Sequence, residues 1–121
     1  MLRRLNWAFG ASFVAVSIAQ GAVIAHGLDR FEPSKEKQHA LRIALNNAKT
    51  MTMLNGLGLC LITLRSKSSL ALIPTSLLLA GSVLFPGIIW YETYTKDKQF
   101  HHLIKFGGAA MIFGWFSMAI L

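Results

Sequence analysis

The sequence predicts an all-α integral membrane protein: a single domain of residues 1–121 that forms a four-helix bundle, with a short amphipathic helix at the membrane surface before the second span. Hydrophobic residues make up 54% of the 121 residues. Charged residues make up 14%, about half the usual share in soluble domains. The mean hydropathy is +0.49. The apolar C-terminal run at about 103–121 also has the length needed to cross a bilayer's hydrocarbon core.

The first predicted span covers about residues 5–26 and follows a short basic start. One side of this helix is mostly small, with Gly10, Ser17 and Gly21 at spacings that let a partner helix approach closely. A basic start before an apolar run is also the order of a secretory signal peptide, but this run is longer than the apolar region of such a peptide. We therefore expect a permanent membrane helix.

The second predicted element is an amphipathic helix at about 34–49. Ser34 is placed to act as its N-cap, and Leu41 and Leu45 lie on an apolar stripe while Arg42 lies on another face. This pattern fits a helix that rests on the membrane surface and runs into the second span. It fits equally the solvated first turns of one long transmembrane helix, and the two alternatives differ only by a bend.

The second predicted span covers about 46–64. Gly56 and Cys60 lie four residues apart and make a small face for helix packing. A single cysteine excludes an internal disulfide, so Cys60 is interpreted as a small packing residue. The polar turn at 65–69 is short enough to make the next helix run back antiparallel.

The third predicted span covers about 70–91 and contains an internal proline. Pro86 removes one hydrogen bond of the helix and clashes with the carbonyl of Ser82, so we expect a kink there. Trp90 and Tyr91 close the span as aromatic residues of the kind found at membrane interfaces.

The fourth predicted span covers about 103–121. Gly107, Gly108 and Gly114 let another helix approach closely, and Lys105 lies near the end of the span, where its ammonium can reach the headgroups. Four spans put both termini on the same side of the membrane.

The net charge of +7 is interpreted as membrane-surface charge. The basic residues fall almost entirely in the short polar stretches, where they set topology and contact anionic lipids such as cardiolipin. No stretch has the basic, aromatic-interleaved character of a nucleic-acid interface. The count of basic residues on the two sides does not determine the orientation. The residues predicted to contact lipid headgroups are Arg3, Arg4, Arg42, Lys49, Arg65, Lys67 and Lys105.

Polar residues within the spans predict contacts between helices rather than chemistry. Gln20 and Asn55 carry amides that can bond across helices, and Ser82 can satisfy backbone groups near the kink. The charged residues fall at span ends, whereas a proton or ion path needs them near the middle.

No catalytic or metal motif is evident. The sequence has no Ser-His-acid arrangement, phosphate-cradling glycine loop or haem-type cysteine pair. His101 and His102 are adjacent, and only His26 and His39 could join them as ligands if the two longer loops meet. We expect no enzyme activity, no cofactor and no metal site.

Three stretches of the sequence carry a family resemblance. They are Ala25-His26-Gly27, the run from Phe85 to Tyr91, and the block from Phe106-Gly107-Gly108 to Gly114-Trp115. Through them the chain, over nearly its whole length, resembles the transmembrane protein 256-like family, also called domain of unknown function 423, found in bacteria and in animal mitochondria. The resemblance implies a four-helix membrane fold and no particular activity. Asn55 stands where that family usually has a histidine, and Lys105 where it has a proline, so any chemical role of that histidine would be lost here.

The expected function is that of a non-catalytic, accessory membrane subunit of a larger assembly, most simply a respiratory complex or supercomplex of the mitochondrial inner membrane. The expected partners are membrane lipids and the other membrane subunits of that assembly. Two alternatives remain: a small oligomeric transporter or channel that uses Gln20, Asn55 and the Pro86 kink, and a lipid-binding protein that uses the basic helix before the second span.

Overall fold

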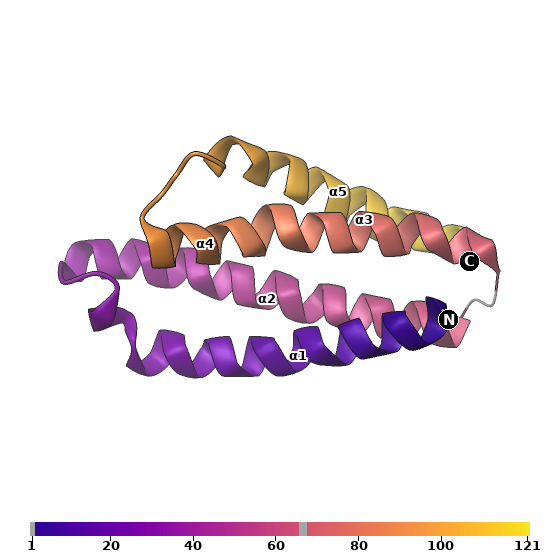
Figure 1. The fold of residues 1–121 in the computed structure, drawn as a ribbon, viewed down its shortest axis with the longest axis horizontal. Coiled ribbons are helices and arrows are strands. Elements are labelled where there is room, and N and C mark those ends of the chain that lie inside the picture. Colours follow the sequence, from indigo (N-terminus) through magenta and orange to yellow (C-terminus); the bar gives the residue numbers. More distant parts are fainter. Residues whose placement is uncertain (1, 66–67) are drawn as a thin grey trace.

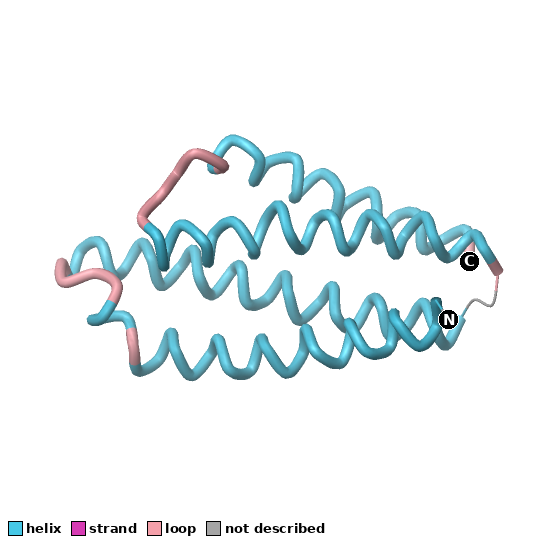
Figure 2. The backbone as a smooth tube through the Cα atoms, viewed as in Figure 1, coloured by secondary structure: helices cyan, strands magenta, loops and turns pink. Residues whose placement is uncertain are grey.

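The structure is a computed structural model that describes residues 2–65 and 68–121. All its regular elements in these ranges are helical, which confirms the all-α prediction. Figure 2 shows helix along most of the chain, with loops at the two ends of the molecule. The helices are α1 (Leu2–His26), α2 (Lys35–Arg65), α3 (Leu72–Ser82), α4 (Ile88–Thr95) and α5 (Ile104–Ser117). A π-helical turn (Val83–Gly87) joins α3 to α4, and 3₁₀ turns cover Leu28–Arg30, Ser69–Ala71, His101–Leu103 and Met118–Ile120.

The helices run side by side along the long axis of the molecule, with both termini at the same end (Figure 1). The most extensive packing joins α1 to α2 and α3 to α5. The α2 helix also packs against α3, the π-helical turn and α4, so it lies between α1 and the α3–α4 rod.

Three helical segments are long and apolar enough to cross a membrane: Leu2–His26, Ser69–Thr95 and His101–Ile120. They contain the first, third and fourth predicted spans. The second predicted span, about 46–64, falls in α2, which is not among them. Because α2 packs against α1 on one side and α3–α4 on the other, its buried faces can carry polar residues that lipid would not accept.

A separate amphipathic helix at 34–49 is not found, because Lys35–Arg65 is one continuous helix of 31 residues. No proline or glycine interrupts it before Gly56, and Leu45 and Ala48 are fully buried across the predicted junction. The apolar stripe therefore continues into the core without a bend. At about 1.5 Å per residue, this helix of 31 residues is longer than the roughly 30 Å thickness of a hydrocarbon core.

Large apolar side chains lie on the outside of the molecule as well as in its core, and several polar side chains are buried. The fully or nearly buried side chains include Asn6, Ser17 and Asn55, whereas Phe116 is 74% exposed and Ile18 is 65% exposed. Large apolar side chains cover the outside of α1 and α5. This distribution is the one expected for helices surrounded by lipid, and it supports a membrane protein.

Glycines mark the closest approaches between helices. A Cβ atom at Gly10 of α1 would lie 2.6 Å from both the Cys60 Sγ and the Gly56 carbonyl oxygen of α2. A Cβ at Gly107 of α5 would lie 2.6 Å from the backbone carbon of Leu84. These positions have no room for a side chain, which brings the backbones together and increases dispersion contact.

The π-helical turn lies at the proline for which a kink is predicted. Pro86 is buried within Val83–Gly87, where the wider turn accommodates a residue that lacks an N–H group. One turn earlier, the Ser82 hydroxyl donates to the carbonyl oxygen of Leu78 at 2.8 Å, so this serine bonds to its own helix.

The adjacent pair Gly107 and Gly108 provides a matched test of helix packing. Gly107→Ala should destabilise the protein by about 1–3 kcal/mol, because its methyl group meets the backbone of Leu84 and Phe85. Gly108→Ala should be neutral or stabilising by up to about 1 kcal/mol, because the nearest atom, Phe85 Cδ2, is 3.8 Å away and alanine favours helix. Unfolding by a denaturing detergent, followed by circular dichroism, measures both. Equal effects at the two positions would contradict this packing.

Candidate functional site

Asn55 is the centre of a buried hydrogen-bonded cluster that joins α2, α3 and α5. Its Nδ2 group donates to the Ser82 Oγ at 2.9 Å and to the Met111 Sδ at 2.9 Å. Its Oδ1 atom accepts from the Trp115 Nε1 at 3.3 Å. We call Asn55, Ser82, Met111 and Trp115 the Asn55 cluster. All the polar atoms of the Asn55 side chain are thus engaged within the chain, which fits the predicted role of Asn55 and Ser82 as interhelical contacts.

A second polar contact joins α1 to α3 near the end that carries the termini. The Asn6 Nδ2 donates to the Thr75 Oγ1 at 2.8 Å, and both residues are buried. Because a buried amide without a partner costs free energy in an apolar medium, this bond holds the two helices at a defined register.

Two arginines bond to backbone carbonyls at the ends of neighbouring helices. The guanidinium of Arg3 donates through Nε and Nη2 to the carbonyl oxygen of Thr63, at 3.2 and 2.9 Å, near the end of α2. The Arg42 Nη1 donates to the carbonyl oxygen of Ile24 at 3.3 Å, near the end of α1. The last carbonyls of a helix lack partners within it, and a cation there is also favoured by the helix dipole. Both arginines are predicted to contact headgroups, and the structure adds this bond within the chain.

The other predicted headgroup residues lie at the ends of the helices or along their sides. Arg4 and Arg65 are exposed, the aliphatic part of Lys49 packs over Gly21, and the Lys105 ammonium lies 5.3 Å from the ring centroid of Phe106. Lys67 lies outside the described residues.

Gln20, predicted as an interhelical contact, has no hydrogen-bond partner for its buried Oε1 atom. It lines a groove of about 450 Å³ together with Thr52, Ser82 and Pro86. The Nε1 group of Trp90, which lines the same groove, is also buried without a partner. This groove therefore combines apolar walls with an unpaired donor and an unpaired acceptor.

The predicted packing residues contribute unequally to contacts within the chain. Gly10, Gly56 and Cys60 meet at the crossing of α1 and α2, and Gly114 packs against Leu78. The Ser17 hydroxyl donates to the Phe13 carbonyl of its own helix at 2.7 Å, so Ser17 is buried without bonding to another helix.

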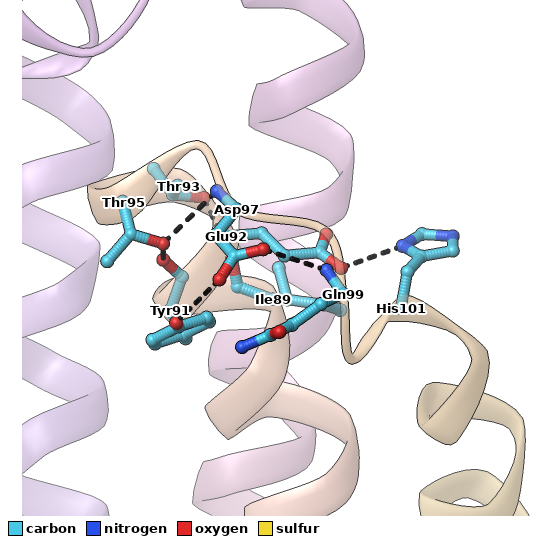
Figure 3. A network of polar contacts seen from close by, with 8 residues as sticks. All are labelled: Ile89, Tyr91, Glu92, Thr93, Thr95, Asp97, Gln99 and His101. Carbon is cyan, nitrogen blue, oxygen red and sulfur yellow. Dashed lines mark hydrogen bonds and ion pairs between the residues drawn. The ribbon is translucent and has the colours of Figure 1, made fainter.

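At the opposite end from the termini, polar residues hold the loop between α4 and α5 (Figure 3). The Asp97 carboxylate accepts from the Tyr91 hydroxyl at 2.9 Å and from the Gln99 backbone N–H at 3.0 Å. The Glu92 Oε1 and the His101 Nδ1 are 2.9 Å apart, within hydrogen-bond distance. In the part of the chain that the structure describes, no group of three or more His, Cys, Asp or Glu side chains is placed to hold a metal ion.

Some of these features could not be found from the sequence pattern. Asn6 stands one turn into an apolar helix, which is a signal for a buried amide, but its partner Thr75 depends on how the helices pack. The alignment of Arg3 with the Thr63 carbonyl likewise depends on tertiary structure.

Comparison with known proteins supports the family resemblance seen in the sequence. The family model described as Protein of unknown function (DUF423) matches residues 20–108. The match covers nearly three quarters of the chain and ends before Gly114 and Trp115, so it is shorter than the resemblance noted from the sequence. No solved structure matches the chain.

Replacing Asn55 by leucine should destabilise the protein by about 1–2 kcal/mol, because contacts with two other helices are lost and the Trp115 indole N–H loses its acceptor. Thr52→Val is the matched control: Thr52 is buried in the same helix but donates only to the Ala48 carbonyl of that helix. The control should change stability by no more than about 0.6 kcal/mol, because the Thr52 hydroxyl bonds only within its own helix. Detergent-induced unfolding measures both variants. If the Asn55→Leu variant is as stable as the wild type, the Asn55 cluster does not contribute to the packing of the helices.

Proposed function

The chain belongs to the family described as Protein of unknown function (DUF423), and we propose that it is a non-catalytic, structural subunit of a larger membrane assembly. In this proposal four helical rods, namely α1, α2, the continuous α3–α4 segment and α5, form a bundle that crosses the membrane four times. The α2 helix crosses between α1 and α3–α4, and both termini lie on one side. Three candidate spans and the large apolar side chains exposed on the outside of α1 and α5 support this placement.

The observation that carries the proposal is a stripe of exposed alanines on α1. These alanines recur at intervals of three and four residues, so they share one narrow face of the helix. The chain's own glycine faces are used inside the molecule, whereas this small face is free on the outside. Where no hydrophobic effect drives helices together, a small face lets another backbone approach closely. The stripe consists of Ala8, Ala11, Ala15, Ala19 and Ala22.

The polar interior supports a structural role. Asn55 and Asn6 are engaged in contacts between the chain's own helices. The formal charge of +7 supports contact with anionic lipids such as cardiolipin. Together with the resemblance to mitochondrial proteins, this charge favours a respiratory complex or supercomplex of the mitochondrial inner membrane as the assembly.

A second candidate function is that of a small oligomeric transporter or channel. The groove that contains Gln20, Thr52, Ser82 and Pro86 favours it, because polar atoms without partners inside a membrane often belong to a pathway for solutes. Three of these residues lie on three different helical elements, α1, α2 and α3, so the groove depends on how the helices pack.

The structural proposal predicts co-migration with a large membrane complex on native gels in mild detergent. Ala15→Leu should lower the co-migrating fraction by about half or more, because it fills the small face of α1. Ala109→Leu, the same change at an exposed alanine of α5, is the control and should leave co-migration unchanged. A chain that migrates only alone or as a small homo-oligomer would contradict the proposal.

The transporter alternative predicts solute or ion flux in liposomes that contain the purified chain. Gln20→Leu should abolish such flux, because it removes the polar atoms of Gln20 from the groove. Gln99→Leu, the same change in the exposed loop between α4 and α5, should not. Liposomes without flux for the wild-type chain would exclude this alternative.

A further inference from the structure

A crevice of about 720 Å³ opens at the loop end of the molecule, between the first half of α2, α4 and the start of α5. The loop between α4 and α5 forms its outer edge, and in Figure 1 α5 begins on the far side of this loop from α4. We call this space the loop-end crevice. It is separate from the Asn55 cluster and from the groove that contains Gln20, since it shares no lining residue with either.

The walls of the loop-end crevice change from polar to apolar with depth. On α2, Lys37 is followed one turn deeper by Leu41 and then by Ala44. On the α5 side, His101 stands at the outer edge and Ile104 lies one turn further in.

The α4 wall shows the same gradient in the opposite chain direction. Glu92 and Thr93 lie near the loop, and Ile89 lies one turn deeper. All three walls therefore place charged or polar groups outside and aliphatic groups inside. This is the order of polarity along a membrane lipid from its headgroup to its acyl chains.

Three lysines and two glutamates line the crevice, so its net charge is positive and favours an anion. The Glu92 carboxylate is 13% exposed and is paired with His101 (Figure 3). Glu32 accepts from the Ser34 backbone N–H at 3.2 Å, and the Lys96 ammonium donates to the carbonyl oxygen of Phe31.

Two lysines remain for a ligand. Lys37 and Lys98 are exposed, and within residues 2–65 and 68–121 neither side chain has a hydrogen bond or ion pair. They stand on different walls of the same crevice, Lys37 on α2 and Lys98 on the loop.

We propose that the loop-end crevice binds one anionic phospholipid, with its phosphate at Lys37 and Lys98 and an acyl chain along Leu41, Ala44 and Ile104. Neither lysine is among the residues predicted from the sequence to contact headgroups. The site is a property of this chain alone and stands whether or not the chain joins a larger assembly.

The test uses the full chain, purified in mild detergent and mixed with equal amounts of phosphatidylglycerol and phosphatidylcholine, with retained lipids counted by native mass spectrometry. The wild type should keep one phosphatidylglycerol in preference to phosphatidylcholine. The double variant Lys37→Gln/Lys98→Gln should lower this retention about tenfold or more, because each lysine near an anionic lipid contributes a several-fold gain in affinity.

The control is Arg30→Gln/Lys35→Gln, which removes the same charge at the same end of the molecule from residues outside the crevice. It should retain phosphatidylglycerol as the wild type does. Ala44→Phe should also lower retention, because it fills the apolar part of the crevice while all charges remain. Circular dichroism and gel filtration establish that each variant is folded.

Three results would overturn the proposal: equal retention of the two lipids, equal loss in the control and the double variant, or displacement of the lipid by an excess of inorganic phosphate. The last would identify a site for free phosphate. None of these results depends on co-migration with a complex, so the lipid site and the structural role can fail separately.

Discussion

Most polar side chains inside this molecule find their partners within the chain, because a membrane offers them no water; Gln20 Oε1 and Trp90 Nε1 are the exceptions among the described residues. Asn55 meets this constraint by bonding to Ser82, Met111 and Trp115, on two other helices. The same constraint accounts for the two arginines that bond to carbonyls at the ends of neighbouring helices. The position of α2 between its neighbours fits the same constraint, because it buries Asn55 between helices.

The sequence predicts the apolar helices better than it predicts their contacts. Three of the four expected spans correspond to helices apolar enough to cross a membrane, because apolar length is a local property. An amphipathic pattern alone does not show whether a helix bends at the membrane surface. The sequence therefore allows both a surface helix that bends into the second span and the single helix Lys35–Arg65 that the structure has. Asn55 and Ser82 were recognised as interhelical residues, whereas the Asn6–Thr75 bond joins residues 69 positions apart and depends on tertiary packing.

The inner surfaces of the helices are used for contacts within the chain, whereas parts of the outer surfaces are left without such contacts. Inside, Gly10 and Gly107 allow backbones to meet, and the polar side chains bond mainly to each other or to their own helix. Outside, the alanine stripe of α1 and the loop-end crevice present unused surfaces of different character, one small and apolar, the other amphiphilic. The proposed structural role rests on this division, because the interior holds the fold together and the exterior is left for contact with other molecules.

Hydrogen exchange of the full chain in lipid nanodiscs tests most directly whether the four rods lie in a bilayer with α2 between the others. The backbone amides of α1, α3 and α5 should exchange slowly. Within α2, residues 45–62 should exchange much more slowly than residues 36–41, because only the later turns lie among the other helices in the hydrocarbon core. Rapid and uniform exchange along α2, or a chain that stays in solution without lipid or detergent, would contradict this arrangement.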